Sequence, residues 1–328
     1  MKKRMNDQRK NALATWVDAC FGIPCSLLPA SEDASFRKYY RLTLPTGATY
    51  IAVDSPPDKE KNHAWLQAQA DLLAIGCRVP LVKFCNLREG FLIISDLGTQ
   101  QYLSAYTTES YPVLIEQAID QLLTIQQGVP SNHYQPYDET LLRQELMIFP
   151  EWYLNKYCKR TLNNAEEKQW QEIIDFIIAR CVSQPKVWVH RDYHSRNLMV
   201  IADSSQPGII DFQDAVQGAI TYDIVSLLRD CYYACPKELE QQILDKVFSL
   251  WQEKLNIKAS HQELQSMYEI SGIQRHLKAT GIFARLYIRD GKSGYLKDIP
   301  RTLQYIQNSL VHFPQLKALA AFCQVTPS

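Results

Sequence analysis

The sequence predicts an α+β protein in which a small antiparallel sheet precedes a larger helical part. Between residues 22 and 95, short β-prone runs alternate with turn residues. From about residue 100 onward, apolar residues recur with the helical period. A short island of β-prone segments within 187–214 interrupts those helices. The length of 328 residues fits one large domain or two modest ones, each able to bury a core.

The first part begins with an amphipathic helix, because Leu13, Trp16, Val17 and Cys20 are spaced as one helical face. The pattern of 38–54 predicts a β-hairpin, since a Pro-Thr-Gly turn separates its two β-prone halves. We expect a five-stranded sheet with a helix in this part. The elements read directly from the sequence are strands at 38–43 and 49–53, a helix from Trp65 to Leu73 closed by Gly76, and strands at 81–85 and 91–95.

The rest of the chain is predicted to be mostly helical. The expected helices span 113–127, 138–157, 165–181, 222–233, 237–255, 261–287 and 301–313. The expected strands of the island are 187–189, 198–201 and 208–210, the last two forming a hairpin.

Composition excludes several classes of protein. The 35 basic and 35 acidic side chains balance, so a surface for nucleic acid is not expected. No run approaches the roughly 20 apolar residues that span a bilayer, and polar residues such as Asp7 and Asp18 interrupt any signal-peptide core. Nine cysteines without a regular framework indicate buried free thiols in a reducing compartment. We expect a cytoplasmic protein with no membrane or nucleic-acid partner; the pattern leaves its oligomeric state open.

The island carries the residues of a phosphoryl-transfer site. Residues 190–197 read His-Arg-Asp-Tyr-His-Ser-Arg-Asn, which places Asp192 and Asn197 at the separation found in the catalytic loop of protein kinases. Asp211 follows the expected hairpin, and a hairpin brings its two ends together. Asp192 is therefore the candidate proton acceptor, and Asn197 and Asp211 are the candidate Mg²⁺ ligands. His190 is expected to brace the loop, and Asp223 to cap a helix or anchor the loop.

This loop, with the aspartate after the hairpin, resembles the aminoglycoside phosphotransferase family of the protein-kinase-like fold. Further segments resemble the anomeric sugar kinases of peptidoglycan recycling, namely 149–153, 226–232, 274–278, 281–286 and 289–292. Those enzymes phosphorylate the 1-hydroxyl of N-acetylmuramate or N-acetylglucosamine. The resemblance implies a bilobal protein that uses ATP and Mg²⁺. Its expected parts are an N-terminal lobe at 1–95, a hinge at 96–99, and a helical lobe at 100–328 with the catalytic loop, the metal site and the substrate pocket.

The expected nucleotide side departs from the kinase pattern. No glycine-rich loop is present, and Asp54 stands where a strand lysine should pair with the phosphates. Three alternatives stay open: a cation from Arg37, Lys38 or Arg41, neutralisation by Mg²⁺ alone, or a chain that transfers no phosphate. The candidate nucleotide-binding residues are Ser35, Phe36, Arg37 and Arg41, with Asp96 and Gly98 in the hinge.

The acceptor should meet polar groups near Asp192. The candidate substrate residues are His194, Arg196, Glu145, Glu151, Asp230, Tyr232 and Arg275. Arg275 could pair with the lactyl carboxylate of a muramate. Two alternative functions are a kinase of another small molecule, such as choline or an aminoglycoside, and a nucleotide-binding scaffold without activity.

Overall fold

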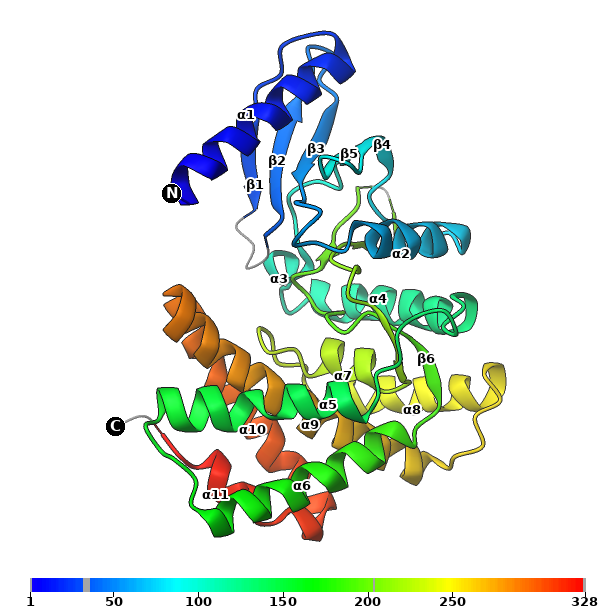
Figure 1. Cartoon of the computed structure of the whole chain (residues 1–328). Coiled ribbons are helices and arrows are strands. Elements are labelled where there is room, and N and C mark those ends of the chain that lie inside the picture. Colours follow the sequence, from blue (N-terminus) through cyan, green and yellow to red (C-terminus); the bar gives the residue numbers. More distant parts are fainter. Residues whose placement is uncertain (1, 32–35, 203, 327–328) are drawn as a thin grey trace. The chain divides into compact units, whose positions relative to one another are not determined.

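A computed structural model describes residues 2–31, 36–202 and 204–326. The chain divides into two compact units (Figure 1). Unit 1 comprises Met1–Gln100 and Leu198–Asp214, and unit 2 comprises Gln101–Asn197 and Ala215–Ser328. The expected lobes had grouped 198–214 with the helices. Backbone hydrogen bonds attach this segment to unit 1 instead, from Ile209 N to Arg78 O at 2.8 Å and from Val200 N to Gln100 O at 2.8 Å.

Unit 1 is built on a five-stranded antiparallel sheet with the order β1-β2-β3-β5-β4. The strands are β1 (Leu28–Ser31), β2 (Lys38–Thr43), β3 (Thr49–Asp54), β4 (Val82–Asn86) and β5 (Phe91–Ser95). The predicted hairpin is confirmed, with Lys38 opposite Asp54 and Thr43 opposite Thr49. Strand β1 was not located from the sequence, because a four-residue run containing Pro29 carries little strand signal. Proline is tolerated there because β1 is an edge strand.

Helix α1 (Lys2–Phe21) covers one face of this sheet, lying across β1, β2 and β3 (Figure 1). Its Leu13 and Val17 are fully buried. They form a core cluster with five buried sheet residues: Tyr40, Leu42, Ala52, Phe91 and Ile93. Because side chains alternate along a strand, the neighbouring residues Ile51 and Val53 point to the opposite face. The predicted amphipathic helix is confirmed.

Helix α2 (Asn62–Ala74) links the sheet to the short hairpin of β7 (Leu198–Met199) and β8 (Gly208–Ile209). The ring of Trp65 on α2 lies against the ring of Phe212, with 5.2 Å between their centroids. The hairpin is shorter than the expected 198–201 and 208–210, since only two residues pair on each side.

Unit 2 is helical. Its helices are α3 (Tyr102–Ala105), α4 (Ser110–Gly128), α5 (Glu139–Leu146), the π-helix η1 (Phe149–Tyr157), α6 (Asn164–Val182), α7 (Tyr222–Leu228), α8 (Lys237–Lys254), α9 (His261–Asp290), the 3₁₀ turn η2 (Ser293–Asp298), α10 (Ile299–Ser309), the turns η3 (Leu310–His312) and η4 (Pro314–Leu316), and α11 (Leu319–Cys323). The single helix expected at 138–157 is wrong: it breaks before Pro150, which has no N–H for the α-helical ladder. The helix expected at 222–233 ends already at Leu228.

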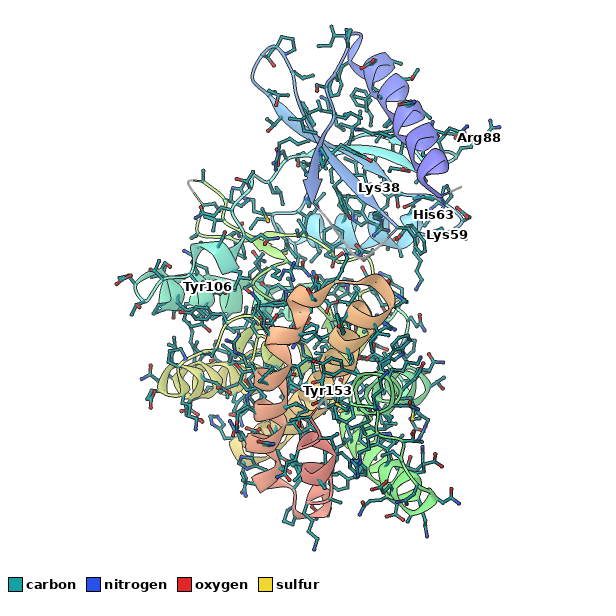
Figure 2. All side chains as sticks on the ribbon, turned by 90° about the vertical axis from the view of Figure 1, so that its left-hand side faces the viewer. Lys38, Lys59, His63, Arg88, Tyr106 and Tyr153 are labelled. Atoms are coloured by element: carbon teal, nitrogen blue, oxygen red, sulfur yellow. The ribbon has the colours of Figure 1, made fainter. Side chains whose placement is uncertain are left out.

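Helix α9 is the central element of unit 2, and most of its residues from Tyr268 to Gly281 are buried. A Cβ atom on Gly281 would lie 2.7 Å from the backbone of Ile148, so glycine allows α9 to approach the start of η1 closely. Tyr153 of η1, visible in Figure 2, donates a hydrogen bond to Val325 O at 2.6 Å and thereby ties the end of the chain to this core.

A two-stranded sheet is formed by one strand before the loop 190–197 and one strand after it. Strand β6 (Lys186–Val189) pairs antiparallel with β9 (Val216–Ala219). Strand β9 was missed in the sequence because its Val-Gln-Gly-Ala run is short and weakly β-prone. Over the described residues, no helix is long and apolar enough to cross a bilayer.

Candidate active site

The loop 190–197 follows β6 and is held by both ends of helix α7. Asp223, in the first turn of α7, accepts hydrogen bonds from the backbone N–H of His190 at 2.7 Å and of Arg191 at 3.0 Å. Arg191 has a φ of 76°, an unfavourable conformation that these bonds stabilise. Of the two expected roles for Asp223, the structure shows the loop anchor.

Asp230, two residues after α7, is the second anchor. It accepts hydrogen bonds from the N–H of Ser195 at 3.0 Å, from the Ser195 hydroxyl at 2.5 Å and from the N–H of Tyr232 at 2.9 Å. The side chain is 2% exposed. Asp230 was a candidate substrate residue, and its contacts give it a positioning role in the loop.

Asp192 lies in the half-buried part of this loop. Burial by itself raises the pKa of Asp192, but nearby positive charges, among which Lys278 contributes most, lower it to about 2. The carboxylate is therefore ionised at neutral pH and can accept a hydrogen bond from a hydroxyl. The Asn197 amide nitrogen donates to Asp192 O at 3.0 Å, which directs the amide oxygen to the other side of the group.

A buried ionic network centres on Glu145 of α5, which is 5% exposed. Glu145 pairs with Arg191 of the loop and with Lys278 of α9, whose Nζ lies 3.0 Å from its Oε1. Tyr137 and Gln274 also donate to it, Gln274 at 3.2 Å. Burial raises the pKa of Glu145, and the charges of Lys278 and Arg191 reverse that effect and lower it. Glu145, a candidate substrate residue, is thus fully engaged as a counter-ion.

Four of the remaining acceptor candidates are His194, Arg196, Tyr232 and Arg275. His194 and Arg196 both contact Tyr232: the His194 ring lies edge-on at 5.4 Å, and the Arg196 guanidinium lies 4.8 Å from the Tyr232 centroid. Arg196 also faces the ring of Tyr295 at 5.4 Å. Arg275 is 5% exposed and donates to the Cys231 sulfur at 3.4 Å.

Glu151 stands apart from these groups. It pairs with Lys156 of the same π-helix at 2.6 Å, and both side chains are exposed. Its contacts do not bring it together with the catalytic loop.

In unit 1, Arg41, Asp96 and Gly98 form one hydrogen-bonded group. Arg41 Nε and Nη2 donate to the two oxygens of Asp96 at 2.6 and 2.9 Å, and Nη2 also donates to Gly98 O at 2.9 Å. Asp96 in turn accepts from the N–H of Gly98, whose φ of 91° favours glycine. Phe36 is exposed at 64%, and Ser35 lies outside the described residues.

Asp54 is buried and paired with Arg9 of α1. Arg9 Nε and Nη2 lie 2.8 and 2.5 Å from Asp54 Oδ1, and Nη2 also donates to Glu89 O at 2.8 Å. The sequence analysis missed Arg9. The available signal was its position four residues before Leu13, on the helix face that covers the sheet.

Asp211 follows strand β8 and adopts a left-handed backbone with a φ of 67°. Its Oδ1 accepts a hydrogen bond from the Gln213 amide at 2.7 Å, and the adjacent Phe212 is fully buried. Within the described part of the chain, no cluster of three or more His, Cys, Asp or Glu could hold a metal. Magnesium that bridges phosphates needs only one or two protein carboxylates, so the single carboxylate of Asp211 suits the chemistry of this ion.

Comparison with known proteins identifies the family. Residues 26–251 match the sequence profile of the phosphotransferase enzyme family, whose short name is APH. The chain belongs to this phosphotransferase family. An N-acetylmuramate/N-acetylglucosamine kinase of Pseudomonas aeruginosa is 34% identical, with 98% of each chain covered. A kinase of the same name from Pseudomonas putida is 36% identical, over 96% of this chain and 95% of the relative.

The crystal structure of the ADP-bound aminoglycoside phosphotransferase APH(2'')-Ib aligns with a TM-score of 0.59. It covers 91% of this chain and 98% of that protein at 13% identity, a likeness that concerns the fold alone. The predicted α+β, kinase-like fold and the predicted family are confirmed. As a phosphotransferase, the chain is an enzyme, and its loop 190–197 lies within the matched region.

Proposed function

We propose that this phosphotransferase transfers phosphate from ATP to the 1-hydroxyl of N-acetylmuramate, N-acetylglucosamine or both. The observation that carries the proposal is the identity of 34 and 36% to two kinases named for these sugars, over at least 95% of every chain compared. The product would be a sugar 1-phosphate. We place the reaction in the cytoplasm, in the recycling of cell-wall sugars.

The catalytic loop supplies the groups that the reaction needs. Asp192 accepts the proton of the attacking hydroxyl, and its pKa of about 2 keeps it ionised for that role. Asn197 and Asp211 are the residues that would hold Mg²⁺, and the ion would neutralise charge on the transferring phosphate when bound. Asp223 and Asp230 keep the loop in place through its backbone N–H groups.

The acceptor side of the proposal uses the residues grouped around Tyr232. Burial lowers the pKa of His194, so this side chain is neutral at pH 7 and can donate to or accept from a sugar hydroxyl. Arg196, held between Tyr232 and Tyr295, offers a cation to the lactyl carboxylate of a muramate. Arg275 remains a second candidate for that contact.

The test is a substrate panel with Mg-ATP. N-acetylmuramate, N-acetylglucosamine, choline and an aminoglycoside are each incubated with the protein, and ADP release is measured. Phosphorus NMR of the product then locates the phosphate through its coupling to the anomeric proton. We expect turnover on at least one amino sugar and phosphate at position 1.

Other outcomes assign the chain to an alternative. Turnover on choline or the aminoglycoside alone would identify a kinase of a different small molecule. Calorimetric binding of Mg-ATP without turnover on any acceptor would favour a scaffold and refute the proposal.

A further inference from the structure

The strand position that carries the phosphate-binding lysine in kinases is occupied by Asp54 in this chain. Asp54 lies on the face of the sheet that α1 covers, where Arg9 neutralises it. Asp54 is 2% exposed and has its own cation. It therefore neither supplies a positive charge nor presents an open negative charge to a nucleotide.

Arg37 is a cation on the opposite face. It immediately precedes β2, where Lys38 and Tyr40 point toward the α1 side, so alternation turns Arg37 away from α1. The side chain is 4% exposed. Its Nε donates to the Ser55 hydroxyl at 2.9 Å, and its Nη2 lies 3.5 Å from Glu60 Oε2.

The partners of Arg37 are themselves held in place. The Ser55 hydroxyl donates to Asn62 Oδ1 at 2.5 Å, and Asn62 Nδ2 donates to Ser55 O at 2.9 Å. Glu60 also accepts the N–H of Phe36 at 3.0 Å. The guanidinium is thus oriented by a hydroxyl and a carboxylate that are tied to the start of α2.

The same end of α2 contacts the segment that carries the proposed Mg²⁺ ligand. Trp65, one turn after Asn62, packs on Phe212, the residue after Asp211. All of these residues belong to unit 1. A phosphate chain that reaches a metal on Asp211 would therefore lie on the face of the sheet where Arg37 is held.

The other two candidate cations have different positions. Arg41 is bound bidentately to Asp96 and also to Gly98 O, which makes it part of the expected hinge. Lys38, labelled in Figure 2, lies opposite Asp54 in the β2–β3 register and on the α1 side. Arg37 alone of the three combines burial with a place beside α2.

We propose that Arg37 supplies the positive charge that binds the nucleotide phosphates in place of the absent strand lysine, with Glu60 as its positioning partner. A guanidinium has five N–H donors in a planar fork, so it can keep Ser55 and Glu60 while it contacts a phosphate. The arrangement resembles the lysine–glutamate pair of protein kinases, with an arginine just before β2 in place of the strand lysine. This inference rests on the proposed ATP-dependent activity.

The test measures nucleotide affinity rather than turnover. Dissociation constants of ATP, ADP and adenosine are determined by calorimetry for the wild type, Arg37→Gln, Arg37→Lys and the matched control Lys38→Gln, with Mg²⁺ and with EDTA. We expect Arg37→Gln to weaken ATP and ADP by about 10- to 100-fold, or about 1.4 to 2.8 kcal/mol, and to leave adenosine unchanged. The loss should persist in EDTA, since the contact does not pass through the metal. Arg37→Lys should recover part of it, and Lys38→Gln should change affinity less than twofold.

Each other outcome has a defined meaning. ATP affinity within twofold of the wild type in Arg37→Gln would overturn the inference and leave the proposed function standing. An equal loss for ATP and adenosine would show a structural role for Arg37 and also overturn it. A wild type that binds no ATP would refute the proposed function, and the inference with it.

Discussion

The two units hold their functional charges in different ways. In unit 2, the loop 190–197 is continuous in sequence, and its Arg191 pairs with Glu145, which also pairs with Lys278, in one buried network. In unit 1, the cations stand on different elements and on opposite faces of the sheet, with Arg9 on α1 and Arg37 before β2. A charge within a continuous loop can be located by its spacing, whereas a charge that acts across a sheet can be located only by knowing which face it occupies.

Two of the candidate substrate residues of unit 2, Glu145 and Asp230, are buried carboxylates that already have partners within the protein. A buried carboxylate is stable in its charged form only when it is paired. Glu145 satisfies that requirement through two cations. Asp230 does so through two hydrogen bonds from Ser195 of the loop and one from the N–H of Tyr232. In this unit, acidic side chains therefore stabilise the conformation of the loop that carries Asp192.

The largest expected effect tests the catalytic loop directly. Asp192→Asn removes the proposed proton acceptor without changing its size, so kcat for the proposed sugar substrate should fall by about 100- to 10,000-fold. Thermal unfolding should show a native fold. Asp175→Asn, an exposed carboxylate paired with Arg143, is the matched control and should retain full activity. Near-normal activity in Asp192→Asn would remove Asp192 from the reaction.

The second effect tests the buried network. Glu145→Gln leaves the cations Arg191 and Lys278 without their common counter-ion, which should cost about 3 to 5 kcal/mol in the free energy of unfolding. Urea denaturation measures this cost. Glu116→Gln, which breaks an exposed pair with Lys246, should cost no more than about 1 kcal/mol. Equal losses in the two variants would contradict the difference between buried and exposed pairs.

The third effect tests the other side of the comparison, in unit 1. Arg9→Gln leaves the Asp54 carboxylate buried without its cation, and we expect a loss of about 1 to 3 kcal/mol in the free energy of unfolding. The affinity of the folded protein for ATP should stay within twofold of the wild type, unlike that of Arg37→Gln. Arg88→Gln, an exposed change near the edge of unit 1 in Figure 2, is the control for stability. A marked loss of ATP affinity in Arg9→Gln would mean that the α1 side of the sheet also serves the nucleotide.

The smallest effect concerns pH. Lys278 is the strongest of the charges that depress the pKa of Asp192, so Lys278→Met should raise that pKa. A nearby opposite charge is worth about one to three pKa units, so the acid limb of kcat/KM, which lies below the measured range in the wild type, should move toward neutral pH by up to about three units and enter that range in the variant. In the wild type, a pKa of about 2 keeps Asp192 ionised throughout the pH range in which the protein is assayed. The profile is measured between pH 4 and 8, where circular dichroism reports a native fold. An unchanged acid limb would show that Lys278 does not act on Asp192.

Much of the fold could be read from local patterns. Strands β2 and β5 match the predicted 38–43 and 91–95, and α8 and α9 lie close to the predicted helices, because alternation and helical periodicity are properties of neighbouring residues. The errors of the sequence-based prediction lie in elements whose formation depends on tertiary contacts. Strand β9 exists because β6 pairs with it, and a π-helix replaces the second half of a predicted helix at Pro150.

The site divides in the same way. The sequence alone was enough to locate the loop 190–197 and the aspartate after the hairpin, because they lie within about twenty residues of one another. Together these residues also indicated the family. Only the tertiary structure showed that Asp54 pairs with Arg9 and that Asp230 anchors the loop. It alone also placed Ser55 and Glu60 beside Arg37. The physical reason is that the energy of a charge depends on which groups surround it after folding, and those groups come from distant parts of the chain.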